Sequence, residues 1–449
     1  METKKKGFPA AFWVCACTEI FERLAYYLGR SLILIFVTAS VATGGLGLSD
    51  TVAANMQSNL TAFSYLLPLF GAVIVDKYIG ARYTTPVAMF IAAAGYFTGG
   101  IAKSSAGVYA MIFLVSLGLA LFKNGAIIGR VITDKSQMDP AFSMRYTLVN
   151  VGAFIGTFLV GILYKDVFAK DGVLGFAPCF KMAALMMVLG GLWYIFVCWR
   201  FLGDLGKLPF KKTLTEEEKA AEAKKKEETG TKQPLTTIEK KRIGAIFVAS
   251  LFSIVFWIFW YLGYMPVYFY WAENMDWVVA GYQVPSTWFD AANSLFCVIL
   301  GPVTAALWKK LAARPQGDMS LFRKTGLGIA IIGVGYLFYA AIDIMRGGEK
   351  ASVLWLIVFA FLLTMGEMFF SPLGHSFISK YSPSRYLAVM MSVWGFATFI
   401  AAKSYGPVYG LLFGGKIEFK VACIGVAVVS FAAALSMIAL DKKLSALVD

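Results

Sequence analysis

The sequence predicts an all-α integral membrane protein with twelve transmembrane helices. Hydrophobic residues make up 59% of the 449 residues, and charged residues only 15%, against about 25% in an average soluble domain. Apolar runs of about 18 residues or more, enough to cross about 30 Å of hydrocarbon, recur along nearly the whole chain. The runs lack the regular alternation of a membrane β-barrel, so helices are favoured.

Each of the twelve predicted spans is one of these long apolar runs. In chain order they lie near 11–40, 52–76, 84–102, 107–132, 143–164, 178–202, 243–270, 288–310, 326–345, 352–379, 387–412 and 419–440.

The basic residues predict the orientation in the membrane. With the N-terminus placed in the cytoplasm, 29 of the 41 Lys and Arg residues fall on the inner side and 8 on the outer side. This bias follows the positive-inside rule, with both termini cytoplasmic as an even helix count requires. The net charge of +14 is therefore mainly a matter of topology, and no nucleic-acid partner is expected. We expect a multi-pass protein of the plasma (inner) membrane.

One charged stretch, 203–242, interrupts the apolar pattern and divides the chain into two six-helix bundles. The bundles span 11–202 and 243–441, with a cytoplasmic N-terminus at 1–10 and a cytoplasmic tail at 442–449. The stretch has no apolar run long enough for a span, so we expect a cytoplasmic linker without additional transmembrane helices. The alternative is a lateral helix lying on anionic headgroups.

Several ionisable residues lie inside the predicted spans, where each costs about 2.5–3.5 kcal/mol on insertion scales. At 100° per residue, six polar residues of the first span share an arc of about 140°. They are Glu19, Glu22, Arg23, Tyr26, Tyr27 and Arg30. The opposite arc is apolar, so the charged face should point into the bundle. Lys123 in the fourth span and Glu367 in the tenth are expected near mid-membrane depth.

Enzymatic chemistry is not expected from this sequence. It has one histidine, no HExxH motif and no glycine-rich phosphate loop, and its six cysteines lack the spacing of a zinc site or a disulfide framework. The prediction is a protein that is not an enzyme and has no cofactor or metal.

Two six-helix halves joined by a long cytoplasmic loop resemble the major facilitator superfamily, whose halves rock about a midplane site. After the second span, "GAVIVDKYIGARYTT" is similar to the inner-loop motif of that superfamily. The resemblance implies a gating and structural role for Gly71, Asp76, Gly80 and Arg82. Glycine permits the tight turn, and Asp76 and Arg82 are expected to pair near helix ends.

A narrower resemblance covers most of the chain. "EIFER" followed by "YY" in the first span resembles the ExxER motif of the proton-coupled oligopeptide transporter family, also called the POT or PTR family. "FSMRYTLVNVGAF" resembles a second signature, although Arg145 is unusual there. "STWFDAANSLF", "GEMFFSPLG" and "AVMMSVWGF" are similar to the eighth, tenth and eleventh helices of that family.

The family resemblance implies roles for the charged residues. Glu19, Glu22 and Arg23 would form a proton-linked cluster, in which protonation of a glutamate releases Arg23 to another partner. Arg30 and Lys123 would attract the carboxylate of a substrate.

Other implied roles fall on the second bundle and on polar or aromatic side chains. Glu367 would bind the amino terminus of a peptide and take part in proton coupling. Further substrate contacts are implied for Asn150, Asn293, Tyr26, Tyr27, Tyr65 and Trp394. A zwitterionic peptide needs a cationic and an anionic pole, which these residues would supply.

The chain departs from the family in its seventh span. Family members usually carry a glutamate there that pairs with the arginine matching Arg30, but this span has no acid between Arg242 and Glu273. Asp290, one turn before Asn293, is the candidate replacement, as a partner for Arg30 or as a second proton-titrating acid.

The function that we predict is proton-coupled symport of di- and tripeptides by alternating access, carried out by a monomer in the lipid bilayer. One alternative keeps the scaffold but carries another solute, such as nitrate or a carboxylated metabolite. Another is a sensor that binds peptides without transporting them. At the level of single residues, the acidic cluster and the pair of Lys123 and Glu367 could be structural salt bridges, and the aromatic residues could be ordinary packing.

Overall fold

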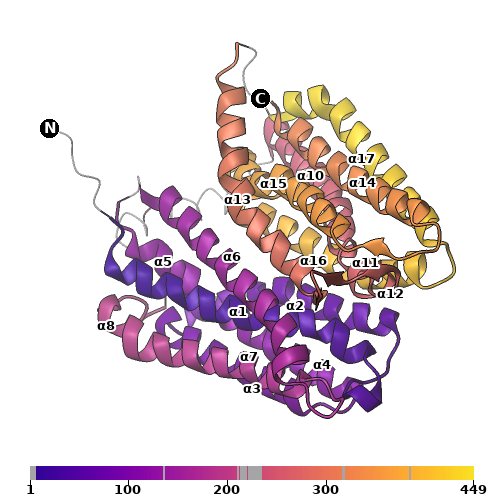
Figure 1. Cartoon of the computed structure of the whole chain (residues 1–449). Helices are drawn as coiled ribbons and strands as arrows, with labels where there is room; N and C mark the ends of the chain where they lie inside the picture. The colour runs from indigo at the N-terminus through magenta and orange to yellow at the C-terminus, as the bar shows by residue number, and fades with distance from the viewer. Residues whose placement is uncertain are drawn as a thin grey trace. The chain divides into compact units, whose positions relative to one another are not determined.

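The computed structural model describes residues 7–134, 137–209, 212, 220, 235–315, 319–383 and 386–448. It confirms the predicted all-α class (Figure 1). The first half of the chain forms α1 (Ala10–Thr38), η1 (Val41–Thr43), α2 (Asp50–Lys77), α3 (Ala81–Ile101), α4 (Ser105–Leu121), α5 (Asn124–Val131), α6 (Met138–Ile162), η3 (Leu163–Val167), α7 (Phe176–Trp193), η4 (Tyr194–Cys198) and α8 (Trp199–Leu202).

The second half begins with a helix whose first turn has a capping box. Thr236 Oγ1 accepts from the Glu239 backbone N–H (3.2 Å), and Glu239 Oε2 accepts from the Thr236 N–H (2.9 Å), so two unpaired donors of the first turn are satisfied. The helices are α10 (Thr237–Leu262), α11 (Met265–Tyr268), α12 (Tyr270–Asn274), α13 (Trp288–Ala312), α14 (Leu321–Met345), α15 (Trp355–Tyr381), α16 (Leu387–Phe413) and α17 (Phe419–Val448).

The only strands in the described ranges are four two-residue pieces at loops. β1 (Met275–Asp276) pairs in parallel with β4 (Ala351–Ser352), and β2 (Val278–Val279) pairs antiparallel with β3 (Tyr282–Gln283).

Each predicted span falls on a helix or on a run of consecutive helices. Within the described ranges, nine such segments are long and apolar enough to cross a membrane by length and composition. The charged helix α1 is not among these nine. The exact number of spans and the side on which the termini lie stay predictions.

Two predicted spans are each interrupted within their predicted bounds. The fourth is interrupted, because α4 ends at Leu121 and α5 begins at Asn124. The seventh is also interrupted, because α10 stops at Leu262 and a new short helix, α11, begins at Met265 with Pro266 in its first turn. Proline has no N–H to donate to the preceding turn, and its ring crowds the carbonyl group four residues before it, which for Pro266 is that of Leu262; both effects favour a break there.

The predicted linker and tail also differ in part. Residues from Thr237 onward belong to α10, and most of 203–242 lies outside the described residues. The expected tail at 442–449 is helical, because α17 continues to Val448. Asp441 on α17 pairs with Arg323 on α14 at 2.6 Å, which holds this helix end in place.

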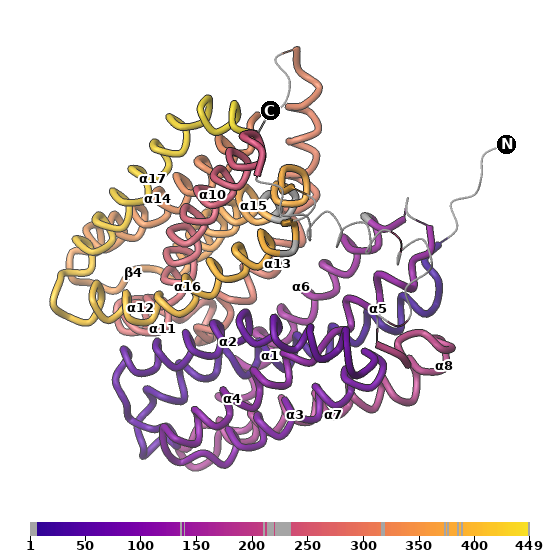
Figure 2. Tube along the Cα trace, turned by 180° about the vertical axis from the view of Figure 1, so that it is seen from behind, coloured from indigo at the N-terminus to yellow at the C-terminus, as the bar shows by residue number. Residues whose placement is uncertain are grey.

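The chain divides into two compact units, one of Met1–Ser49 and Leu66–Leu214, the other of Asp50–Tyr65 and Thr215–Asp449. In the first unit α1 packs against α6 and α7, and α3 packs against α4 and α7 (Figures 1 and 2). In the second unit α14 packs against α15 and α17, α10 against α16, and α13 against α15.

Close packing of α1 on α6 depends on two glycines. A Cβ at Gly152 would lie 2.8 Å from the carbonyl oxygen of Ile20, and one at Gly156 would lie 2.4 Å from that of Leu24. Residues four apart share a helix face, and small residues on such a face allow membrane helices to approach closely. The apolar arc of α1 is therefore covered in part by α6.

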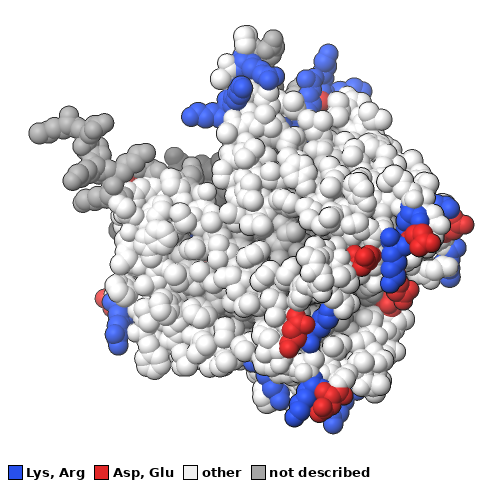
Figure 3. All heavy atoms as spheres, viewed as in Figure 1, with Lys and Arg blue, Asp and Glu red and all other residues white. Residues whose placement is uncertain are grey.

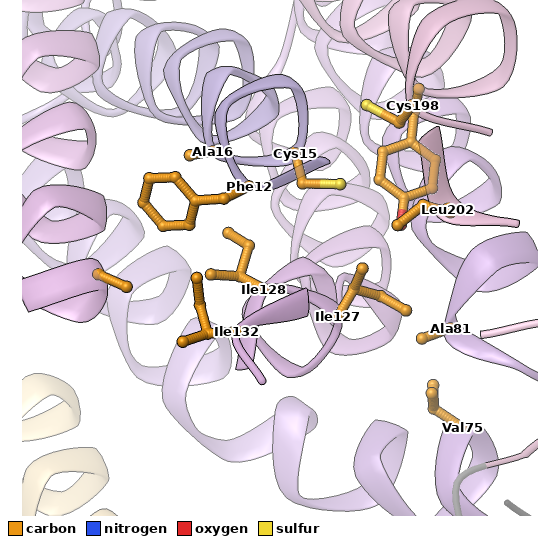
Figure 4. Close-up of a cluster of buried hydrophobic side chains, with 12 residues drawn as sticks. Phe12, Cys15, Ala16, Val75, Ala81, Ile127, Ile128, Ile132, Cys198 and Leu202 are labelled. Atoms are coloured by element: carbon orange, nitrogen blue, oxygen red, sulfur yellow. The ribbon is translucent and has the colours of Figure 1, made fainter. Parts of the chain in front are cut away.

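A buried hydrophobic cluster closes one end of the first unit. Phe12 and Cys15 of α1 face Ile127 and Ile128 of α5 (Figure 4). The other members are Ala16, Val75, Ala81, Ile132, Ala141, Tyr194, Cys198 and Leu202. Because Cys15 is one turn before Glu19, this cluster excludes water from one side of the charged face.

The outer surface carries many exposed apolar side chains, such as Phe113 (61% exposed) and Leu435 (67% exposed). Figure 3 shows broad uncharged areas between a few groups of charged atoms. A surface of this kind suits contact with lipid.

Candidate functional site

Three of the four charged side chains on the polar face of α1 are buried, and Arg23 is partly exposed. Glu19 is 2% exposed, Glu22 1% and Arg30 5%. A charge in such a place is costly unless it has a partner, so the partners of each group define the site.

Glu22 and Arg23, adjacent in sequence, form a bidentate ion pair. Arg23 Nη2 donates to Glu22 Oε1 at 2.7 Å, and Arg23 Nε donates to Oε2. The guanidinium carbon lies 5.0 Å from the ring centre of Tyr26, which packs edge-on against Tyr27. Of the predicted cluster of Glu19, Glu22 and Arg23, the structure thus pairs Glu22 with Arg23.

Glu19 has other partners, which the sequence did not predict. Its Oε1 accepts from Arg145 Nε of α6 and from Asn124 Nδ2 of α5, each at 3.0 Å. Asn124 also donates to the backbone oxygen of Cys15 at 2.8 Å. The single clue in the sequence was that Arg145 is unusual in its motif; nothing pointed to Asn124.

We predicted Lys123 in the middle of a helix, but it lies at the break between α4 and α5. Its Nζ donates to the backbone oxygen of Pro68 in α2 at 2.9 Å. The break frees the Lys123 backbone from the regular helix, and the ammonium group thereby reaches across to α2. Described residues offer it no carboxylate within ion-pair distance.

In the second unit, Glu367 of α15 is held by neutral groups from α13. Asn293 Nδ2 donates to Glu367 Oε2 at 3.2 Å and to Thr364 Oγ1 at 2.8 Å, and Cys297 Sγ lies 3.7 Å from the same carboxylate oxygen. No Lys or Arg among the described residues pairs with Glu367. Glu367 and Asn293, which were each predicted to contact the substrate, are thus in direct contact with one another.

Asp290 is buried one turn before Asn293 on α13 and is 6% exposed. Its Oδ2 accepts from the hydroxyl group of Tyr268 in α11. This contact links α13 to the short helix that follows α10.

The remaining predicted substrate residues have varied surroundings. Asn150 Nδ2 donates to the backbone oxygen of Tyr146 on its own helix, α6, at 3.0 Å. The Tyr65 hydroxyl group accepts from that of Tyr261 at 3.2 Å. Trp394 is 7% exposed and lines a small pocket with Phe370 and other residues of the second unit.

The inner-loop motif holds helix ends together, but the predicted pair of Asp76 and Arg82 does not form. Arg82 Nη2 donates to the backbone oxygen of Trp199 at 3.2 Å, and Nη1 donates to that of Gly203. Because these carbonyls end a helix, they carry partial negative charge and take the place of the carboxylate.

The glycines of the motif mark close backbone contacts. A Cβ at Gly71 would lie 1.9 Å from the backbone oxygen of Ala120, and one at Gly80 would lie 2.1 Å from that of Gly206. The described residues contain no group of three or more His, Cys, Asp or Glu side chains that could bind a metal ion.

Comparisons with known proteins agree with this architecture. A model of the POT family matches residues 204–413. An uncharacterized transporter, YclF, of Bacillus subtilis is 25% identical over 439 residues, covering 89% of this chain and 87% of its own. A di-/tripeptide transporter of Lactococcus lactis is 24% identical and covers 86% of each chain.

A solved structure gives the same picture for the fold. The crystal structure of a POT family transporter in complex with 5-aminolevulinic acid superposes with a TM-score of 0.85 at 23% identity, covering 98% of each chain. The fold is therefore that of the major facilitator type. The family match over residues 204–413 and relatives aligned along most of both chains show that this protein is similar to the POT family of membrane transporters.

Proposed function

We propose that this protein is a proton-coupled symporter that imports di- and tripeptides across the plasma membrane by alternating access. The observation that carries the proposal is Glu367, a buried carboxylate held by Asn293 and Cys297 with no basic partner among the described residues. Such a carboxylate suits a cationic ligand, and the amino terminus of a peptide is one.

The cationic pole of the proposed site lies in the first unit. We assign the substrate carboxylate to Arg30 and Lys123, because Arg30 is buried and the Lys123 ammonium is bound by a neutral carbonyl. A carboxylate ligand would form a stronger hydrogen bond with the Lys123 ammonium group than the neutral Pro68 carbonyl group does. Asn150, Asn293, Tyr26, Tyr27, Tyr65 and Trp394 are proposed to complete the contacts with the peptide.

The proton-coupling role is proposed for the acids of α1 and of the second unit. Glu22 and Arg23 form a pair that protonation would break, which would release the guanidinium group to another partner. Asp290 is proposed as a second titrating acid, because it is a buried carboxyl group that accepts a hydrogen bond from the Tyr268 hydroxyl group. Import of one positive charge gains about 2.3 kcal/mol per 100 mV of membrane potential.

A second candidate substrate class is a small amino acid-like solute with an amino group and a carboxylate. The POT family structure with 5-aminolevulinic acid favours it, since that ligand has both groups. Competition with a panel of dipeptides separates the candidates, because a peptide carrier is inhibited by many dipeptides and a dedicated carrier of another solute by none.

Uptake of labelled dialanine into proteoliposomes, driven by outside acidification, tests the main proposal. The parent should accumulate the label, whereas Glu367→Gln and Lys123→Ala should lose most of the uptake. Glu418→Gln is a matched control, because Glu418 is exposed and pairs with Lys420 at 3.0 Å. Absence of uptake by the parent would refute peptide transport, and absence of counterflow as well would indicate a sensor.

A further inference from the structure

One face of α6 brings Arg145 to the charged face of α1. Arg145, Gly152 and Gly156 are spaced by seven and four residues, so they lie on the same side of the helix. The two glycines pack against the backbone of Ile20 and Leu24. Two turns earlier on the same face, Arg145 reaches Glu19.

The two glutamates of α1 have separate guanidinium partners. Glu22 pairs with Arg23 through both nitrogens that face it, and Glu19 pairs with Arg145 at 3.0 Å. The Glu19 side chain is 2% exposed, whereas that of Arg145 is 30% exposed. Arg145 is thus a partly solvated cation that neutralises a buried carboxylate.

Asn124 gives Glu19 a partner in either protonation state. Its Nδ2 now donates to the carboxylate, and its Oδ1 has no hydrogen-bond partner among the described residues. Rotation of the amide group by 180° would present Oδ1 as an acceptor to a protonated Glu19. Asn124 can therefore bond to either form of Glu19, although the rotation would give up its bond to the Cys15 carbonyl oxygen.

Gly125, next along α5, leaves room for the guanidinium group. A Cβ there would lie 3.0 Å from both Cζ and Nη2 of Arg145, which is closer than ordinary van der Waals contact. Asn124 and Gly125 at the start of α5 thus form one wall of the Glu19 site.

Apart from Arg145, the charged and titratable groups near Glu19 come from two elements, α1 and η4. On α1 they are Glu22, Arg23 and Cys15, and η4 contributes Cys198, which lies 3.6 Å from Thr18. In the described contacts, the only cation bonded to Glu19 is Arg145 of α6.

We propose that Glu19, Arg145 and Asn124 form a second proton-responsive site, separate from the Glu22–Arg23 pair, in which Arg145 is a positioning residue for Glu19. The proposal rests on the proposed proton-coupled transport. Proton binding converts the Glu19 carboxylate to the acid and breaks its ion pair with Arg145, while Asn124 keeps the acid in place. Loss of the proton restores the pair.

The test is the pH profile of dialanine uptake for a set of variants. Arg145→Gln removes the cation that favours the carboxylate form, so half-maximal uptake should shift to higher pH by about one unit. Arg145→Lys keeps the charge and should shift it less. Gly125→Ala should shift the profile in the same direction as Arg145→Gln. Arg200→Gln changes an exposed arginine of α8 and should leave the profile unchanged.

A double-variant comparison separates a role through Glu19 from a general loss of structure. In a Glu19→Gln background, Arg145→Gln should cause no further change in the pH profile, because the group that it acts upon is gone. Dialanine counterflow at fixed pH shows whether each variant is folded. If Arg145→Gln gives no counterflow, Arg145→Lys replaces it, and its pH profile is measured in the parent and in the Glu19→Gln background.

The outcomes are distinct. A parental pH profile for Arg145→Gln, or equal shifts in both backgrounds, would overturn the proposal for Arg145 while leaving peptide transport intact. A parent that takes up no dialanine would instead refute the proposed function itself.

Discussion

The two glutamates of α1 have partners on different helices, even though they are only one turn apart. Glu19 contacts α5 and α6, whereas Glu22 contacts its own neighbour Arg23. The helical arc predicted that both glutamates face inward, because that follows from 100° per residue. It could not reveal the partners, since Asn124 and Arg145 are more than a hundred residues away.

The role of Arg30 can be tested with a change in the substrate. We expect Arg30→Met to weaken binding of dialanine about tenfold or more, because an ion pair to a buried cation is lost. The variant should bind dialanine amide, which lacks the carboxylate, nearly as the parent does. Inhibition constants of the two ligands measure the difference, and an equal loss for both would argue against a carboxylate contact.

Asp290 is the acid that we propose as a second titrating group. Asp290→Asn should flatten the pH dependence of uptake, since the amide cannot take up a proton yet can still accept from Tyr268. Asp204→Asn is a suitable control, because Asp204 is an exposed loop residue paired with Lys207 at 2.6 Å. An unchanged rate and pH profile for Asp290→Asn would rule out the role.

At the scale of elements, the helices follow the apolar pattern but their interruptions do not. Hydropathy is insensitive to the break at Phe122 and Lys123, because the residues on both sides stay apolar. The end of α10 was missed for a similar reason, although Pro266 was a local signal. These irregular points matter for the site, since the first places Lys123 and Asn124, and the second places Tyr268.

The crossing of α1 and α6 predicts a contrast between two helical glycines. Gly156→Ala should lower the stability of the purified protein by about 1–3 kcal/mol, because its Cβ would press on the Leu24 carbonyl. A Cβ at Gly301 in α13 would have no atom within 4 Å, so Gly301→Ala should be neutral or stabilise the protein by up to about 1 kcal/mol. Thermal unfolding in detergent compares them. Equal melting temperatures for the two variants would contradict close packing at Gly156.

For the whole molecule, the distribution of Lys and Arg predicts the orientation. Green fluorescent protein should fluoresce when fused within the linker at 203–242 or after residue 449, because it folds in the cytoplasm. Alkaline phosphatase should be active when inserted in the loops near Gly47 or Gly348, which the positive-inside rule places outside. The opposite pattern would contradict twelve spans with cytoplasmic termini.

The sequence by itself determined that this is a helical membrane protein, because spans, charge bias and the one-sided polar face of α1 depend on local composition and on helix periodicity. Its motifs also located Glu22, Arg23, Glu367 and Asn293. Only the tertiary structure decided which groups meet. Arg145 reaches Glu19 because two glycines let α6 approach α1, and Arg82 binds carbonyls in place of Asp76. Such pairings depend on distances between helices remote in the chain, which periodicity along one helix does not contain.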